Sequence, residues 1–284
     1  MILITGATGK LGHHVVAELL AKVPASQIAV AVRSPDKAAD FAKLGIAVRQ
    51  ADYSRPETLD AALAGVDKVL LISSNEVGQR VAQHGAVIAA AKRAKVKLLA
   101  YTSILRADTS TLELAREHLA TEIVLRASGV PFVLLRNGWY LENYTENLAP
   151  ALAHGSIAGA AQDGRIAAAA RADYAAAAVA VLTSEGHANQ VYELAGDRPF
   201  TMTELAAEVA KQSGKPIAYA NLRPAAYRDL LVSSGLPTAV AGILANADEG
   251  VTRGELDDTT GTLRRLIGRA TTPLADAVAR ALRA

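Results

Sequence analysis

Short apolar segments alternate with longer, helix-length segments through the first half of the chain. The apolar segments are rich in Val, Ile, Leu and Ala on both faces, a pattern typical of strands buried in a parallel sheet. The predicted strands are residues 2–5, 28–32, 46–50, 69–72, 98–102 and 132–135, and the predicted helices are residues 11–22, 35–44, 57–64, 80–94 and 112–128. The alternation predicts right-handed β-α-β units and a Rossmann-type, doubly wound parallel sheet of the α/β class.

The pattern loosens after the last of these strands. A short apolar strand is predicted at residues 191–194, and Thr201 with Glu204 has the spacing of a capping box at a helix start. We therefore expect residues 1–137 to form the sheet domain and residues 138–284 to form a smaller, irregular α/β region on the substrate side. Because no clean linker separates them, the second region is expected to be interleaved with the sheet.

Composition narrows the functional classes. Because 51% of the residues are hydrophobic and only 20% are charged, we expect a folded globular protein. The formal net charge of +2 arises from scattered Lys and Arg without a basic, aromatic-rich run, so no nucleic-acid partner is expected. The absence of cysteine excludes disulfides, thiolate metal sites and cysteine nucleophiles, and the isolated histidines predict no metal.

The sequence shows neither a signal peptide nor a membrane-spanning segment. The first residues lack the basic start of a signal peptide, and the alanine-rich segment 175–182 is too short to span a bilayer. The sequence therefore predicts a cytoplasmic protein with no membrane partner. It leaves the oligomeric state open, a homo-oligomer included.

A glycine-rich turn joins the first predicted strand to the first predicted helix. Its residues are Gly6, Ala7, Thr8, Gly9, Lys10, Leu11 and Gly12. Gly6 permits the tight turn, Gly9 lets the backbone approach a pyrophosphate, and Gly12 lets the helix pack closely on the strand. The helix N-terminus offers free N–H groups to the phosphates. In this strand–turn–helix context the spacing predicts a dinucleotide site; the alternative is a tight turn without a ligand.

The residue after the second predicted strand selects between the nicotinamide cofactors. An NAD enzyme usually has Asp or Glu there to bind the ribose hydroxyls, whereas this chain has Arg33. A guanidinium makes charge-assisted hydrogen bonds to a 2′-phosphate and lies against the adenine. Arg33 therefore predicts NADPH as the cofactor, with weaker use of NADH. The alternative is a solvated surface arginine.

Two further polar loops follow predicted strands, at the sheet edge where open α/β sheets bind ligands. Asp52, beside Tyr53, is expected near the adenine. Ser73, Ser74 and Asn75 are expected near the nicotinamide ribose and the pyrophosphate. A purely structural role, in which each side chain hydrogen-bonds to the backbone of its own loop, explains these polar residues equally well.

The predicted helix 112–128 lacks the Tyr and Lys, four residues apart, with which an ordinary short-chain dehydrogenase donates a proton. It has His118 and Glu122 at that spacing instead. Because an imidazole can transfer a proton near neutral pH, His118 is a catalytic candidate. A surface ion pair between the two residues explains the spacing equally well.

An aromatic cluster follows the sixth predicted strand. Asn137, Trp139, Tyr140 and Tyr144 gather there, and aromatic faces suit a flat, apolar ring stacked near a nicotinamide. Tyr140 and Tyr144 are therefore candidates for binding the substrate, and Tyr140 is a second catalytic candidate. The alternative is a hydrophobic patch that anchors the second region.

These motifs together resemble the NmrA-like atypical short-chain dehydrogenases, and most closely the quinone-reducing bacterial members of that family. The resemblance extends over nearly the whole chain and includes the segments 71–80, 135–144 and 171–174. It implies hydride transfer from NADPH to a quinone. It also implies that the cofactor is lined by the loops described above, by Arg171, and by Asn137, Gly138, Trp139, Tyr140, Leu141 and Glu142.

Two other functions stay open. A dinucleotide-binding redox sensor, which regulates a partner protein without turnover, would also lack the Tyr–Lys pair. An isomerase or epimerase of nucleotide sugars would need an acid–base residue at the hydride site, for which only His118 is available. A quinone reductase tolerates the missing pair best, because the product anion takes its proton from water and the cofactor carries the chemistry.

Overall fold

The computed structural model describes residues 1–283, which divide into two compact units. Unit 1 and unit 2 are each assembled from three stretches of the chain. Unit 1 comprises Met1–Ala107, Arg116–Asn137 and Arg171–Tyr192, and unit 2 comprises Asp108–Ala115, Gly138–Ala170 and residues 193–283. The chain thus returns to unit 1 at Arg171–Tyr192. A single boundary after residue 137 does not describe this return. The functional roles expected for the two regions stay predictions.

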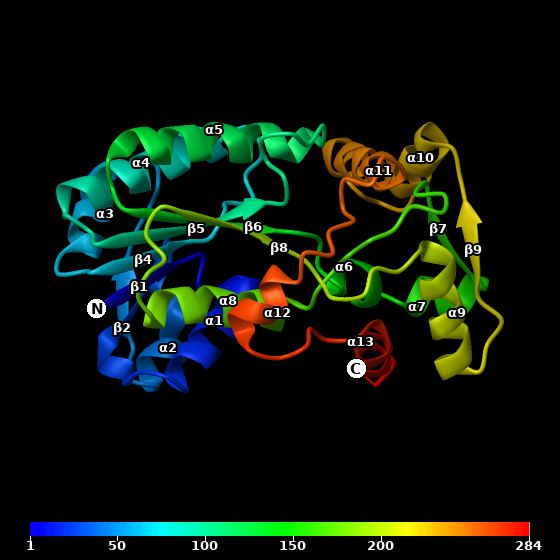
Figure 1. Ribbon diagram of the computed structural model, residues 1–284, viewed down its shortest axis with the longest axis horizontal. Coiled ribbons are helices and arrows are strands. Elements are labelled where there is room, and N and C mark those ends of the chain that lie inside the picture. Colours follow the sequence, from blue (N-terminus) through cyan, green and yellow to red (C-terminus); the bar gives the residue numbers. More distant parts are fainter. Residues whose placement is uncertain (284) are drawn as a thin grey trace. The chain divides into compact units, whose positions relative to one another are not determined.

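Unit 1 is built on a seven-stranded sheet with the strand order β3-β2-β1-β4-β5-β6-β8 (Figure 1). The strands are β1 (Ile2–Thr5), β2 (Ile28–Val32), β3 (Ala47–Gln50), β4 (Lys68–Leu71), β5 (Leu98–Ile104), β6 (Phe132–Asn137) and β8 (Gln190–Leu194). β1 to β6 pair in parallel, and their order is that of the Rossmann fold. The predicted fold class is confirmed.

Helices cover both faces of this sheet (Figure 1). One face carries α3 (Pro56–Leu63), α4 (Arg80–Arg93) and α5 (Glu113–Ser128), and the other carries α1 (Lys10–Leu20), α2 (Ala39–Lys43) and α8 (Arg171–Thr183). Strand residues such as Leu3 and Leu99 are buried together with Leu63 and Val87 of the helices in one hydrophobic core. Strands that are apolar on both faces are therefore covered on both faces.

Among the predicted helices of unit 1, the largest departure lies at residues 35–44, and α8 was not predicted. A single helix is expected over residues 35–44, whereas the structure has a short 3-10 helix, Pro35–Ala38, followed by α2. Ala38 has φ −113° and ψ 14°, outside the helical region, so the backbone hydrogen-bond ladder is interrupted between the two.

Unit 2 consists of short elements around a parallel strand pair, β7 (Ser156–Gly159) and β9 (Ala218–Asn221). Its helices are α6 (Glu142–Thr145), α7 (Ala149–His154), α9 (Met202–Ser213), α10 (Pro224–Ser233), α11 (Thr238–Thr252), α12 (Thr262–Ile267) and α13 (Leu274–Ala281). α10 packs along α11 (Figure 1). The predicted capping box is confirmed, because Glu204 N–H donates to Thr201 Oγ1 at 3.1 Å and Thr201 N–H donates to Glu204 Oε2 at 2.7 Å.

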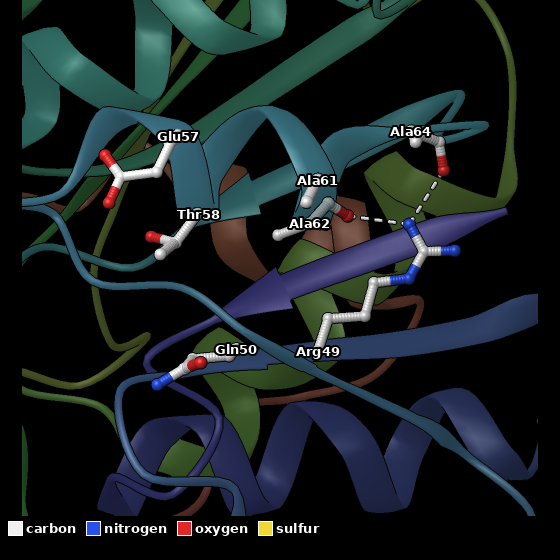
Figure 2. A pocket seen from close by; sticks show the side chains of 7 residues that line it. All are labelled: Arg49, Gln50, Glu57, Thr58, Ala61, Ala62 and Ala64. Carbon is white, nitrogen blue, oxygen red and sulfur yellow. Dashed lines mark hydrogen bonds between the residues drawn. The ribbon is translucent and has the colours of Figure 1, made fainter.

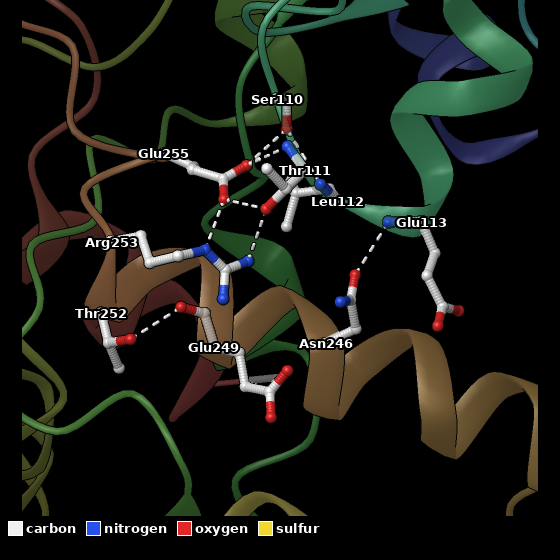
Figure 3. A network of polar contacts seen from close by, with 9 residues as sticks. All are labelled: Ser110, Thr111, Leu112, Glu113, Asn246, Glu249, Thr252, Arg253 and Glu255. Atoms are coloured by element: carbon white, nitrogen blue, oxygen red, sulfur yellow. Dashed lines mark hydrogen bonds and ion pairs between the residues drawn. The ribbon is translucent and has the colours of Figure 1, made fainter.

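A polar network within unit 2 ties the segment 108–115 to the chain just after α11 (Figure 3). The Glu255 carboxylate accepts hydrogen bonds from the hydroxyls of Ser110 and Thr111, each at 2.6 Å, and pairs with Arg253 at 2.8 Å. Burial alone would raise the pKa of Glu255, but these hydrogen bonds outweigh it and lower the pKa to about 2. Glu255 is therefore ionised at neutral pH and fixes the segment that leads into α5.

Candidate functional site

The glycine turn between β1 and α1 has the geometry that its spacing predicts. Gly6 has φ +59°, in the left-handed region, and the Gly9 N–H donates to the Gly6 carbonyl at 3.0 Å. A Cβ on Gly12 would lie 2.4 Å from the Gly6 carbonyl oxygen, so a larger residue would displace the turn. The first turn of α1 has no acidic residue, and its N-cap Gly9 provides no side-chain cap, as is usual where a helix N-terminus binds phosphate.

Arg33 lies just after β2 with its side chain 72% exposed. Its Nη1 is 3.3 Å from Glu76 Oε1, in the loop after β4, and Glu76 Oε2 accepts a hydrogen bond from Gln83 at 2.7 Å. The guanidinium is therefore held toward the loop that contains residues 73–75. Phosphate binding by Arg33 stays a prediction, and so does the alternative of a solvated surface arginine.

The loop after β4 is fixed by buried side chains behind it. The Ser73 N–H donates to Thr102 Oγ1 at 2.9 Å, and the Ser74 N–H donates to His84 Nε2 at 2.9 Å. Burial, with the nearby charge of Arg80, lowers the pKa of His84 to about 4, so the ring is neutral and its Nε2 can accept. The loop backbone is thus held rigidly, as a cofactor-binding loop requires.

Two of the predicted loop residues cap their own loops. Asp52 Oδ1 accepts the Ser54 N–H at 2.9 Å, and Ser74 Oγ accepts the Glu76 N–H at 3.1 Å. These bonds give Asp52 and Ser74 a structural role of their own. Contacts of Asp52 with adenine and of Ser74 with ribose or pyrophosphate stay predictions.

His118 and Glu122 do not form the ion pair that their spacing on α5 permits. Both side chains are buried, and each faces another partner. Glu122 is paired with Arg136 by hydrogen bonds of 2.9 and 2.7 Å and accepts the Ser103 hydroxyl at 2.6 Å. The surface ion pair expected as the alternative is therefore wrong, because β6 supplies a buried guanidinium to Glu122.

The buried position of His118 also bears on its predicted catalytic role. Its Nδ1 lies 2.8 Å from the Tyr101 hydroxyl. Burial lowers the pKa of His118 to about 3, with smaller contributions from the charge of Arg80 and, at acid pH where it is protonated, from His84. The imidazole is therefore neutral at pH 7 and hydrogen-bonded inside unit 1, where it makes a poor proton donor.

Asn137, at the end of β6, has a buried side-chain oxygen without a hydrogen-bond partner. Leaving such a group unpaired costs about 1–3 kcal/mol, so this oxygen calls for a donor from a ligand. The orphaned oxygen and the glycine turn both fit a nicotinamide dinucleotide. Two observations on unit 1 thus support the predicted cofactor.

The predicted cofactor residues are divided between the two units. Unit 1 contains the glycine turn, Arg33, Asp52, residues 73–75, Asn137 and Arg171, and unit 2 contains residues 138–142 and Tyr144. Leu141 is buried, and its N–H donates to the Ala169 carbonyl at 2.9 Å; Tyr140 forms a β-bridge with Ala169. Backbone pairing therefore fixes the start of this segment inside unit 2.

Unit 2 contains a cavity of about 150 Å³ that the sequence did not predict. Trp139 and Tyr144, both predicted site residues, line it together with Tyr227 and Asp248. Asp248 lies on the buried face of α11, among Ala245, Ala247 and Val251. An acid within an apolar helical stripe was the available signal for it.

A second hollow, in unit 1, lies beside β3 and α3 (Figure 2). It is lined by Arg49, Gln50, Glu57, Thr58, Ala61, Ala62 and Ala64. Arg49 donates to the carbonyls of Ala62 and Ala64 at 2.6 and 2.8 Å, as Figure 2 shows. Its charge is therefore used to hold the end of α3, and the hollow contains none of the predicted site residues.

Over residues 1–283 no group of His, Asp and Glu side chains is placed to hold a metal ion. In the same range no helix has the length and apolar character needed to cross a membrane.

A Rossmann sheet with this glycine turn, an arginine after β2 and no Tyr–Lys pair on α5 defines an atypical short-chain dehydrogenase. Residues 1–261 match the NmrA-like family, and the chain belongs to that family. The family expected from the sequence is confirmed.

Individual relatives agree with this assignment. The chain is similar to quinone oxidoreductase 2 of Escherichia coli (strain K12), with 56% identity over 278 residues, 98% of this chain and 97% of the relative. It is similar to the crystal structure of the E. coli NADPH-dependent quinone oxidoreductase with NADPH (TM-score 0.97, 55% identity, 99% of this chain and 100% of that chain). It is also similar to Citrobacter sp. triphenylmethane reductase with NADP(H) (TM-score 0.95, 39% identity, 99% and 100%).

Proposed function

We propose that this protein is an NADPH-dependent quinone oxidoreductase. The observation that carries the proposal is the similarity, over almost the full length of both chains, to the E. coli quinone oxidoreductase that binds NADPH. The chain's own glycine turn, the orphaned oxygen of Asn137 and the position of Arg33 support the same cofactor.

NADPH, when bound, supplies the hydride, and a quinone is an acceptor strong enough to need little acid catalysis. The residues of this chain bind the cofactor and orient it. The N-terminus of α1 would bind the pyrophosphate, Arg33 the 2′-phosphate, and Asn137 Oδ1 would accept a hydrogen bond from a polar group of the cofactor. This division of labour accounts for an α5 without the Tyr–Lys pair.

The remaining site residues enter the proposal with narrower roles. Asp52, residues 73–75, residues 138–142 and Arg171 are assigned further cofactor contacts. Tyr140 and Tyr144 are assigned to the substrate, with Tyr140 as the candidate proton donor. His118 is assigned a structural role, because a neutral, buried imidazole bonded to Tyr101 is not set to donate at neutral pH.

The test is the oxidation of NADPH and NADH by the purified protein, with and without 1,4-benzoquinone or menadione. Acceptor-dependent turnover that favours NADPH is expected. Tight NADPH binding without turnover on any quinone would reject the proposal and favour a redox sensor that acts through a partner. A cytoplasmic location and a homo-oligomer stay predictions, for which fractionation and sedimentation are the measurements.

Arg33→Ala tests the phosphate contact. Loss of one charged hydrogen-bonding partner should weaken NADPH binding by about 1.5–3 kcal/mol and leave NADH binding nearly unchanged. Arg93→Ala, which removes another exposed, paired arginine of unit 1, is the matched control. Equal weakening of both cofactors by Arg33→Ala would contradict the assignment.

A further inference from the structure

The cavity in unit 2 has walls suited to a flat ring. Its lining includes the indole of Trp139, the rings of Tyr144 and Tyr227, and the aliphatic side chains of Leu205 and Ala247. Apolar and aromatic walls with a few polar groups are typical of small-ligand sites. The volume of about 150 Å³ is on the scale of a single ring.

One carboxyl group, that of Asp248, faces this cavity from α11. Its Oδ2 accepts the Ala160 N–H at 2.7 Å, and the side chain is buried. A Cβ on Gly159 would lie 3.0 Å from the same oxygen, so the glycine at the end of β7 permits this approach. No lysine or arginine is among the described residues that line the cavity, so the charge of an ionised Asp248 would be left without a cation.

The electrostatics follow from this burial. Burial raises the pKa of Asp248 to about 6, against a smaller opposing effect of the Ala160 N–H. The titratable side chains that interact with it are Tyr144 of α6, Tyr219 of β9 and Tyr227 of α10. Burial raises the pKa of each of these tyrosines, so all three stay protonated at neutral pH. Of the four groups, Asp248 is the one that changes charge near pH 6.

We infer that this cavity binds the ring of the quinone substrate, with the protonated carboxyl of Asp248 donating a hydrogen bond to a ring oxygen. The identity of the ring rests on the proposed function. Trp139 and the tyrosines supply the faces against which a quinone stacks. If Asp248 served only to accept the hydrogen bond from the Ala160 N–H, the aromatic cavity beside its carboxyl group would have no role.

Trp139 makes occupancy of the cavity measurable, because it is the single tryptophan of the chain. Cofactor-free protein is titrated with 1,4-benzoquinone, and fluorescence lifetimes separate complex formation from collisional quenching. The expected result is saturable static quenching, weakened at least tenfold by Ala247→Leu, which fills the cavity. Ala239→Leu, the same change on an exposed part of α11, is expected to match the wild type. Purely collisional quenching of the wild type would overturn the inference.

The pH dependence of this binding tests Asp248 itself. If the protonated carboxyl is the donor, affinity for 1,4-benzoquinone falls about tenfold for each pH unit above the pKa. Asp248→Asn keeps a donor and should bind with an affinity that no longer depends on pH. Asp229→Asn, an exposed aspartate on α10, should keep the wild-type slope. A wild-type affinity that is flat with pH would overturn the role of Asp248, and this comparison also decides the matter if Ala247→Leu does not fold.

Steady-state kinetics separate the inference from the proposed function. Saturable quenching that depends on Ala247 and Asp248, without any quinone turnover, would support the cavity and reject the reductase. Quinone turnover with a KM that neither Ala247→Leu nor Asp248→Asn changes would keep the reductase and overturn the cavity as its substrate site.

Discussion

Glu122 in unit 1 and Asp248 in unit 2 are both buried carboxyl groups on long helices, but their surroundings differ. Glu122 lies between a guanidinium and a hydroxyl, and the side chains of Glu122 and Arg136 are 1% and 5% exposed. Asp248 accepts a hydrogen bond from the backbone N–H of Ala160 and faces a cavity instead of a cation. Glu122 is therefore held by partners on β5 and β6, whereas Asp248 can take up a proton in its cavity.

This difference in partners distinguishes an acid with a structural role from an acid that can hydrogen-bond to a ligand. The Glu122 carboxylate is committed to protein partners, because it accepts two hydrogen bonds from Arg136 and one from Ser103. A carboxyl in an apolar cavity keeps both an acceptor and, when protonated, a donor. Variants of the two groups should therefore behave in opposite ways.

The largest effect is expected for Glu122→Ala. Removal of the carboxylate takes the Glu122 partner away from the buried Arg136 guanidinium, which should lower the free energy of unfolding by about 3–5 kcal/mol. Urea unfolding followed by circular dichroism measures this. The double variant Glu122→Leu with Arg136→Met, which removes both charges, should recover most of the loss. A single variant as stable as the wild type would refute the structural role of the pair.

Asp248→Asn should stabilise the protein at alkaline pH. Because the pKa of Asp248 is raised from 3.8 to about 6, the folded protein holds the proton more tightly than the unfolded chain. Its contribution is therefore present at low pH and is lost as the pH rises through this window. The variant should gain up to about 3 kcal/mol at pH 8 and nothing at pH 4. Asp229→Asn should show no such pH dependence, and a gain at both pH values would contradict the argument.

Glu255→Gln should show the opposite sign within the same unit. The pKa of Glu255 is lowered from 4.5 to about 2, so its stabilising effect is complete above 4.5 and is lost as the pH falls toward 2. At pH 7 the variant should lose about 1.5–3 kcal/mol, because the four hydrogen bonds to the Glu255 carboxylate weaken together. Thermal unfolding between acid and neutral pH measures the difference. A loss that persists unchanged at the acid limit would mean that packing, and not charge, is responsible.

The smallest effect is expected for an exposed pair. Glu76→Gln releases Arg33 from a partner at 3.3 Å whose side chain is 46% exposed. Exposed pairs contribute about 0–1 kcal/mol, so NADPH should bind at most about fivefold more tightly and stability should hardly change. Asp60→Asn, which breaks the exposed pair with Arg93, is the control. Weaker NADPH binding in Glu76→Gln would show that Glu76 orients Arg33 and does not compete for it.

The elements of unit 1 follow from local patterns. Strands of Val, Ile and Leu bounded by turn residues, and a glycine turn whose third glycine has no room for a Cβ, depend on neighbours in sequence. These features were predicted within a few residues. The boundary between the units was harder, because Arg171–Tyr192 joins unit 1 through contacts between residues distant in sequence.

Side-chain partners were predicted less well than elements. The spacing of His118 and Glu122 indicated a pair on one helix face, yet β5 and β6 supply their partners Tyr101 and Arg136. Asp248 was missed altogether, because its partner Ala160 and the tyrosines that interact with it lie on other parts of the chain.

By itself, the sequence determined the Rossmann class, the glycine turn between β1 and α1, and the family. Hydrophobic periodicity, backbone freedom at glycine and the charge of a single side chain are properties of a few adjacent residues. Only the tertiary structure decided which acids are paired, which histidines are neutral and where a cavity remains. Those outcomes depend on burial and on partners brought together from distant parts of the chain. Desolvation of a side chain cannot be read from the order of residues alone.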